Sequence, residues 1–175
     1  MKAIAQRREG TTLDVLVGRI ICHDVRDAGG KIAVPKGACL DRALAETLLG
    51  TPWEEIHLIA VEPGDMHEEE AGARLAAAIV GEGAEVKGYS GGQWTLAATR
   101  RGLLRIRRAD LARVNAQEGI SVFTLFDGQP VEPGEAVAKA KVTPLVIAEP
   151  TIRAVEETAR AAAGLVGVTG FRPTT

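Results

Sequence analysis

The sequence is poor in aromatic residues, cysteine and histidine, and each shortage argues against a class of function. Aromatic residues make up 3% of the 175 residues, too few for the base-stacking platforms of single-stranded nucleic-acid binding. Cys22 and Cys39 are too isolated for a disulfide framework or a paired-cysteine metal site. Three histidines leave few ligands for a transition metal. We therefore expect no nucleic-acid partner and no resident metal ion.

The chain also lacks a strong net charge and a long apolar run. A formal net charge of −2 gives no general attraction to phosphate backbones or anionic lipids. No stretch approaches the roughly 18 to 20 consecutive apolar residues of a membrane span, and residues 1–9 lack the apolar core of a signal peptide. We expect a cytoplasmic globular protein that does not associate with membranes.

Residues 1–62 predict a small α/β unit with the order strand, helix, strand. Residues 11–17 alternate in the way of a half-buried strand, and a second short strand is expected at 31–34. Asp41 is a natural N-cap for the helix that follows, and residues 55–61 predict the closing strand.

The rest of the chain predicts a capped helix and a β-rich barrel or sandwich over residues 63–148, then a C-terminal helix over 149–164. Asp65 is expected to cap the first of these helices, with Glu68 as its capping-box partner. Residues 165–175 lose the pattern and predict a flexible tail or linker. The expected fold class is α+β.

Arginines concentrate in one stretch of the chain, and guanidinium groups suit bidentate contact with phosphate or carboxylate. A solvated strand face is the alternative interpretation of the same pattern. Lys36, in a Pro-Lys-Gly turn, is another candidate for an anion, and we select it with Arg100, Arg101 and Arg105 as ligand-binding candidates. The cluster has five members within nine residues: Arg100, Arg101, Arg105, Arg107 and Arg108.

Two pairs of polar residues are candidates for proton transfer or metal binding, although no catalytic residue is identified. Asp24 could orient His23 for acid–base work, but neighbours in a strand point to opposite faces, so a structural role for His23 stays open. His67 and Glu70 share a helix face at the spacing of a metal pair that needs a further ligand. Residues 90–92 either turn a hairpin or form a small nest of amides for an anion.

Six short stretches, spread over nearly the whole chain, resemble a known family in their order and spacing. They are VGRIICHD (17–24), PKG (35–37), EPGDMHEEEA (62–71), GLLRI (102–106), VEPG (131–134) and TPLVI (143–147). Together they resemble the leading domain of molybdopterin-binding proteins of molybdenum-cofactor biosynthesis, related to the molybdopterin molybdotransferase and competence-damage-protein group.

The resemblance implies an accessory or ligand-handling domain that is not catalytic by itself. In that family the pterin is bound by a second domain, recognised by a phosphate loop rich in glycine and threonine at a strand-to-helix turn, and this sequence has no such stretch. Molybdopterin is therefore expected to be reached through a domain outside this chain. The implied partner is that molybdopterin-binding domain or an enzyme of the pathway.

Three hypotheses for function remain open at this point. In the first, the arginines contact phosphate or carboxyl groups of a ligand or partner. In the second, the chain is a small enzyme in which His23, Asp24, His67 and Glu70 converge as an acid–base or metal site. In the third, the chain is a homo-oligomerisation module that pairs its apolar strand at 120–126, or its alanine-rich ribbon, with another copy.

Overall fold

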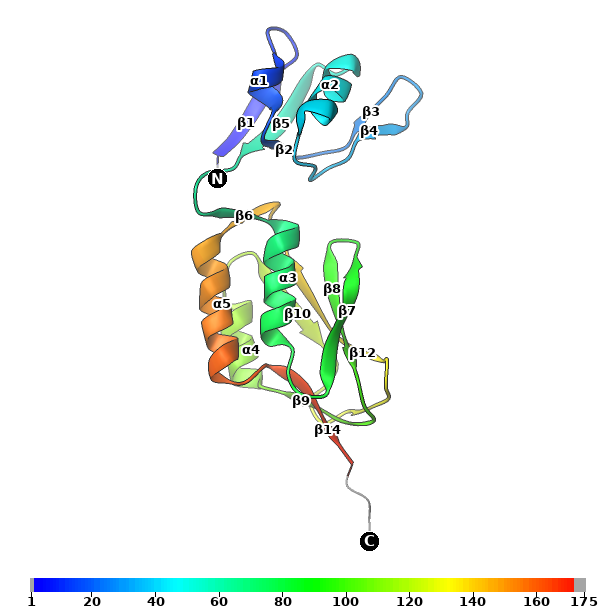
Figure 1. Cartoon of the computed structure of the whole chain (residues 1–175), viewed down its shortest axis with the longest axis vertical. Helices are drawn as coiled ribbons and strands as arrows, with labels where there is room; N and C mark the ends of the chain where they lie inside the picture. Colours follow the sequence, from blue (N-terminus) through cyan, green and yellow to red (C-terminus); the bar gives the residue numbers. More distant parts are fainter. Residues whose placement is uncertain (1, 172–175) are drawn as a thin grey trace. The chain divides into compact units, whose positions relative to one another are not determined.

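The computed structural model describes residues 2–171 as an α+β protein with two compact units, which divide between Asp65 and Met66 (Figure 1). The division lies close to the boundary expected after residue 62. Helices and short strands in several small sheets confirm the α+β class. Within the described residues no sheet closes on itself, so the β-rich part is not a closed barrel.

The first unit is built on a three-stranded antiparallel sheet with β5 in the middle. Leu16 and Leu48, from its two helices, are buried in one apolar cluster with Ile56 and Leu58 of the central strand. Burial of these side chains is what holds the unit together. Its elements are β1 (Lys2–Arg7), α1 (Leu13–Leu16), β2 (Arg19–Ile21), the hairpin of β3 (Val25–Arg26) and β4 (Ile32–Val34), α2 (Arg42–Gly50) and β5 (Glu55–Ala60).

The strand predicted at residues 11–17 is wrong, because this segment contains the short helix α1. Leu16 is fully buried and Leu13 packs against the same cluster, whereas Val15 and Val17 are exposed. Leu13 and Leu16, which face the core, therefore have the i, i+3 spacing of a helix rather than the alternation of a strand. Strand β1, which the sequence analysis did not predict, pairs with β5 along its whole length.

Helix α2 confirms the predicted cap at Asp41, whose carboxylate accepts a hydrogen bond from the Leu44 N–H at 2.8 Å. Its other end is capped from the N-terminal part of the chain. The Arg8 guanidinium donates to the carbonyl oxygens of Leu49, at 2.6 Å, and Thr51. A cation at the negative end of a helix satisfies its last carbonyls.

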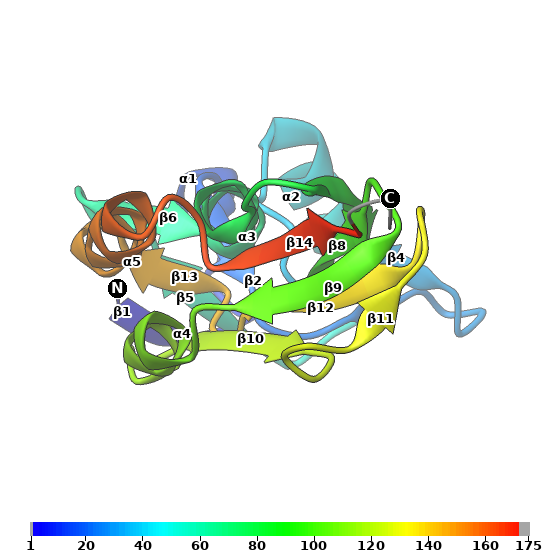
Figure 2. The ribbon, with the colours of Figure 1, turned by 90° about the horizontal axis from the view of Figure 1, so that it is seen from below.

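The second unit combines three sheets with three helices. The four-stranded sheet has the order β10-β12-β8-β7. A three-stranded sheet has the order β11-β9-β14, with β9 in the middle (Figure 2). Strands β6 and β13 form a third, two-stranded sheet. The elements are β6 (Asp65–His67), α3 (Glu68–Ile79), β7 (Ala84–Ser90), β8 (Gln93–Ala98), β9 (Gly102–Ile106), α4 (Arg108–Asn115), β10 (Ile120–Thr124), β11 (Pro130–Val131), β12 (Ala136–Val142), β13 (Val146–Ala148), α5 (Glu149–Ala161) and β14 (Val166–Gly170).

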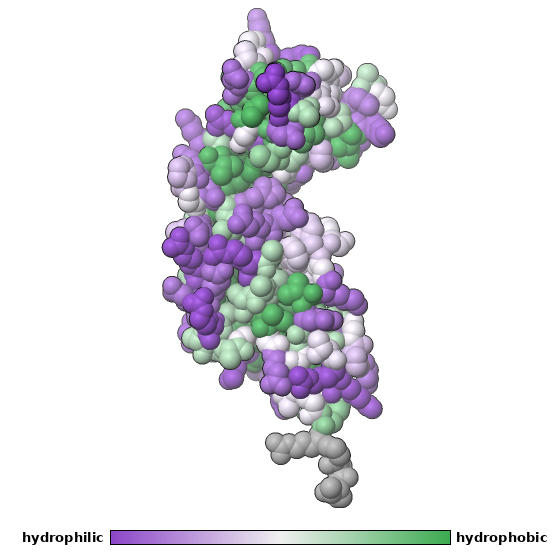
Figure 3. Space-filling model, in the orientation of Figure 1, coloured by the Kyte–Doolittle hydropathy of each residue, from purple (hydrophilic) through white to green (hydrophobic). Residues whose placement is uncertain are grey.

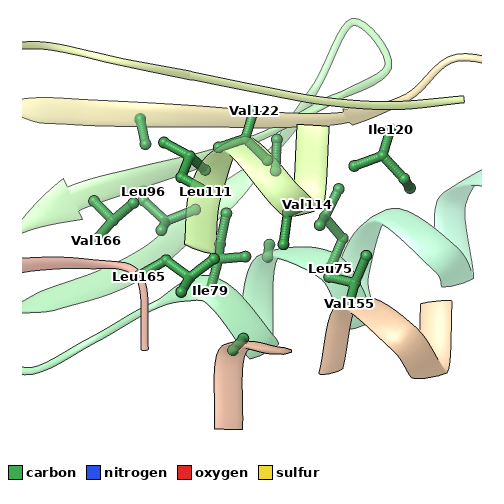
Figure 4. Packing of buried hydrophobic residues seen from close by; sticks show 14 of the residues in the cluster. Leu75, Ile79, Leu96, Leu111, Val114, Ile120, Val122, Val155, Leu165 and Val166 are labelled. Carbon is green, nitrogen blue, oxygen red and sulfur yellow. The ribbon is translucent and has the colours of Figure 1, made fainter. Parts of the chain in front are cut away.

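The core of the second unit lies between the helices and the four-stranded sheet. Leu75 and Ile79 of α3 are fully buried and pack with Val155 of α5, Val114 of α4 and Leu96 of β8 (Figure 4). The helical spacing of the two α3 residues confirms the apolar stripe expected for this helix. Strands β7 and β8 form the hairpin expected at residues 90–92.

Helix α3 begins later than predicted, and the capping box of Asp65 with Glu68 is wrong. The Glu68 N–H donates to the Leu145 carbonyl at 3.0 Å, and β6, which contains Asp65, keeps the chain extended up to this point. His67 is the N-cap instead, with its Nδ1 accepting from the Glu69 N–H at 3.3 Å. Pairing of β6 with β13 therefore overrides the local signal.

Residues 166–170 form β14, so the flexible tail predicted from residue 165 is wrong for this stretch. The strand pairs with β9, and Val166 and Val168 are buried. Val166 and Val168 alternate with Gly167 and Thr169, which is the pattern of a strand. The glycines of this stretch are typical of loops, and they led to the prediction of a tail. Residues 172–175 of the predicted tail lie outside the described residues.

The C-terminal helix, α5, ends in a complete Schellman motif whose left-handed position is an alanine. The Gly164 N–H bonds to the Ala159 carbonyl at 3.0 Å, and the Ala163 N–H bonds to the Arg160 carbonyl at 3.1 Å. Ala163 has a φ of 54°, a conformation in which a side chain costs free energy and glycine does not.

The substitution Ala163→Gly is therefore expected to stabilise the second unit by about 0.5–1 kcal/mol. Glycine removes the cost of the left-handed conformation from the folded state. Part of this gain in stability is lost, because glycine also raises the entropy of the unfolded chain. Urea denaturation would measure it, with Ala162→Gly as the control because Ala162 has a φ of −97°. A loss of stability for Ala163→Gly would contradict the interpretation.

An ion-pair network joins α3 to α5 on the surface. The Arg74 guanidinium donates two hydrogen bonds to the Glu156 carboxylate, both at 2.7 Å, and reaches Glu149 at 3.4 Å. Arg153 also pairs with Glu149, at 3.0 Å. Hydrophilic side chains gather over α5 in Figure 3. Hydrogen bonds from Arg74 lower the pKa of Glu156, and those from Arg153 and then Arg74 lower the pKa of Glu149.

These lowered pKa values predict a loss of stability in acid. A carboxyl group whose pKa is lower in the folded state stabilises the fold above its unfolded pKa of about 4.3, and this contribution disappears as the pH falls through the folded value. Arg74→Met should flatten the dependence of the melting temperature on pH between about pH 5 and pH 3. An unchanged acid slope in the variant would show that the network does not link the helices.

Candidate functional site

A cavity of about 590 Å³ lies in the second unit where the C-terminal ends of α3 and α5 meet strands β9 and β14. Figure 2 shows β14 and β9 side by side on this part of the unit. Three arginines line it: Arg100, just before β9, Arg105 within the strand and Arg107 just after it. Arg105 is exposed while Leu104 is buried, because successive residues of a strand face opposite sides.

Glycines let the main-chain segments around the cavity approach one another closely. Gly81, Gly164 and Gly167 line the cavity. Gly167 pairs with Arg105 in the strand register, and a Cβ on Gly167 would lie 2.8 Å from the Glu82 carbonyl oxygen. Gly164 has a φ of 93°, and a Cβ at this position would lie 2.5 Å from the Gly81 Cα. The connection between α5 and β14 can therefore pass close to the end of α3 only with glycine here.

Positive charge exceeds negative charge in the cavity. Arg100 pairs with Glu82 at 3.1 Å, and Asp127 accepts a hydrogen bond from the Ile106 N–H at 2.9 Å. Arg105 and Arg107 make no ion pair or side-chain hydrogen bond within residues 2–171. Their donors are therefore available to an anion.

The main chain around the cavity is already hydrogen-bonded. The Leu165 N–H donates to the Ile79 carbonyl at 2.8 Å, and the Gly81 N–H donates to the Val166 carbonyl at 2.8 Å. The two helices also present their negative ends here, which attracts guanidinium groups rather than anions. An anion in this cavity must therefore be held by the arginine side chains.

The structure brings together only part of the predicted anion-binding set. Arg100 and Arg105 share the cavity, and Arg107 joins them although it was not selected from the sequence. Arg101 does not line it. The Arg101 guanidinium pairs with Glu132 at 3.0 Å and lies 5.9 Å from the centre of the Phe171 ring.

Lys36 and Asp24 belong to the first unit, where the bond between them is structural: the Asp24 carboxylate accepts from the Lys36 N–H at 2.8 Å. His23 uses its Nε2 to accept the His57 N–H at 3.3 Å, and the two imidazole rings lie edge to face at 5.9 Å. Neither interaction joins His23 to Asp24. The arrangement supports the structural interpretation of His23 over the catalytic one.

His67 and Glu70 do lie together, with Glu69, Ala73 and Trp94, in a shallow hollow of about 370 Å³. His67 caps α3 through Nδ1. No group of three or more His, Cys, Asp or Glu side chains suited to a metal ion occurs in the described part of the chain. The Trp94 Nε1 is buried without a hydrogen-bond partner, where the indole packs against Gly72 of α3.

Comparison with protein-family models, curated proteins and solved structures finds no match to this chain. Among residues 2–171 no helix has the length and apolar character needed to cross a membrane. The candidate functional site of the described residues is the arginine cavity, defined by Arg100, Arg105 and Arg107.

Proposed function

We propose that this chain is a ligand-handling accessory domain whose second unit binds a small anionic molecule in the arginine cavity. The observation that supports it is the pair Arg105 and Arg107, which line the cavity without a partner among residues 2–171. Guanidinium groups form strong, charge-assisted hydrogen bonds with phosphate and carboxylate oxygens. Because they stay protonated, they suit binding better than proton transfer.

The family resemblance suggests the chemical class of the ligand. Molybdopterin and its relatives carry a phosphate group, and the positive charges of Arg105 and Arg107 suit that group. We propose that this unit holds the phosphate end of such a pterin in the cytoplasm, and that catalysis belongs to a partner domain or a pathway enzyme. The six similar stretches support only the place in the pathway, because the family binds its pterin through another domain. Phosphate binding by this unit is supported by the cavity alone.

Calorimetric titration of the purified chain with a pterin phosphate ester tests this proposal. The same pterin without its phosphate, and inorganic phosphate alone, are the matched ligands. We expect saturable binding of the ester, weaker binding of inorganic phosphate, and no binding of the unphosphorylated pterin. Equal binding of the two pterins, or no binding of any of the three, would contradict the proposal.

A further inference from the structure

The two most exposed phenylalanines of the described residues lie at one edge of the four-stranded sheet. The exposed fraction is 62% for Phe123, in the edge strand β10, and 84% for Phe126, in the turn that follows. Phe126 lines a groove of about 550 Å³ between this segment and α4, in which Ile106, Leu111 and Leu125 are the other large apolar side chains. Two exposed aromatic side chains on one segment beside a groove make this surface a candidate interaction site.

The backbone groups in the middle of the free edge of β10 are already hydrogen-bonded. The Asn115 side chain accepts from the Val122 N–H at 2.8 Å and donates to the Val122 carbonyl at 3.0 Å, so it takes the place of a neighbouring strand. Another copy could pair with the whole of residues 120–126 only by displacing Asn115. What stays accessible is the end of the strand at Thr124, beside the groove.

The rim of the groove carries one charge of each sign. Arg108 and Asp127 both line it, yet they do not pair with each other. Arg108 is the first residue of α4, where the positive end of the helix disfavours a cation that has no anionic partner. A surface with one acid and one base is complementary to itself across a two-fold axis, and it favours neither an acidic nor a basic partner.

We propose that two copies of this chain associate through the groove, which we call the Phe126 groove. Phe126 of each copy enters the groove of the other, and Arg108 of each copy faces Asp127 of the second copy. This contact is isologous, so it closes as a dimer and does not propagate. Phe126 and Arg108 do not line the arginine cavity, whereas Ile106 and Asp127 line both the cavity and the groove, so these two residues are shared by the two sites.

Sedimentation equilibrium over a range of protein concentrations tests the proposal. We expect a dimer of twice the 18.4 kDa chain mass. Phe126→Ser should raise the dissociation constant at least about tenfold, as loss of an aromatic anchor does. Phe171→Ser, which changes a phenylalanine outside the groove with 51% exposure, should leave it unchanged. A monomer at all concentrations, or equal effects of the two variants, would overturn the proposal.

Reversing the two charges tests whether the dimer uses this pairing or associates through non-specific apolar contacts. In Arg108→Asp alone, or Asp127→Arg alone, like charges face each other across the two-fold axis and the dimer should weaken. In an equimolar mixture of the two variants, every facing pair is again opposite in charge, so a mixed dimer should form. Failure of the mixture to dimerise while the wild type does would overturn the predicted pairing. Phe126→Ser should still bind phosphate, which separates this test from that of the cavity.

Discussion

Replacing Arg105 and Arg107 together by glutamine is expected to weaken binding of a pterin phosphate ester at least about 100-fold. Each charge-assisted hydrogen bond contributes about 1.5–3 kcal/mol, and 1.4 kcal/mol corresponds to a factor of ten in affinity. Glutamine keeps much of the side-chain length and a donor but removes the charge. Calorimetric titration of the variant beside the wild type measures the loss.

A matched double variant removes the same charge elsewhere in the same unit. Arg101 pairs with Glu132 and Arg113 pairs with Asp110, and neither arginine lines the cavity. Replacing both by glutamine should change the affinity by less than about threefold at physiological salt, because exposed distant charges are screened. Equal losses in the two double variants would mean that overall charge, and not the cavity, attracts the ligand.

Gly164→Ala is expected to lower the free energy of unfolding of the second unit by about 3 kcal/mol or more. The left-handed backbone disfavours any side chain, and the new Cβ would meet the main chain just after α3, at 2.7 Å from the Val80 oxygen and 2.5 Å from the Gly81 Cα. This steric overlap can be relieved only if the α5–β14 connection moves, and such a movement also disturbs the burial of Leu165.

Chemical denaturation followed by circular dichroism measures this effect. Gly88→Ala is the control, since Gly88 lies on β7 in ordinary backbone conformation, and a methyl group added there would have no other atom within 4 Å. Its stability should stay within about 1 kcal/mol of the wild type. A Gly164→Ala protein as stable as the control would show that the close approach of the helix ends is not required.

Local patterns predicted those elements whose signal lies within a few neighbouring residues. Helix α2 follows from the Asp41 cap, α3 from the spacing of Leu75 and Ile79, and the β7–β8 hairpin from Gly91 and Gly92. Each depends on contacts close in sequence. The side-chain period and the turn residues are sufficient to specify such elements.

The missed elements depend on partners far away in the chain. Strand β1 needs β5, and β14 needs β9. The same reason explains the site. The arginine cluster was visible in the sequence, but the segments that separate Arg101 from Arg105 come from elsewhere. Glu132 pairs with Arg101, and the α5–β14 connection lines the same cavity as Arg105. Sequence spacing alone does not distinguish a paired arginine from an available one.

The most direct test of the arginine cavity is a titration of isotopically labelled protein with inorganic phosphate, followed by amide NMR. Our account predicts that the largest shifts occur at Arg105, Arg107 and Gly167, and that they saturate along one binding curve. Shifts that centre on Lys36 or on the Phe126 groove, or shifts that never saturate, would contradict it.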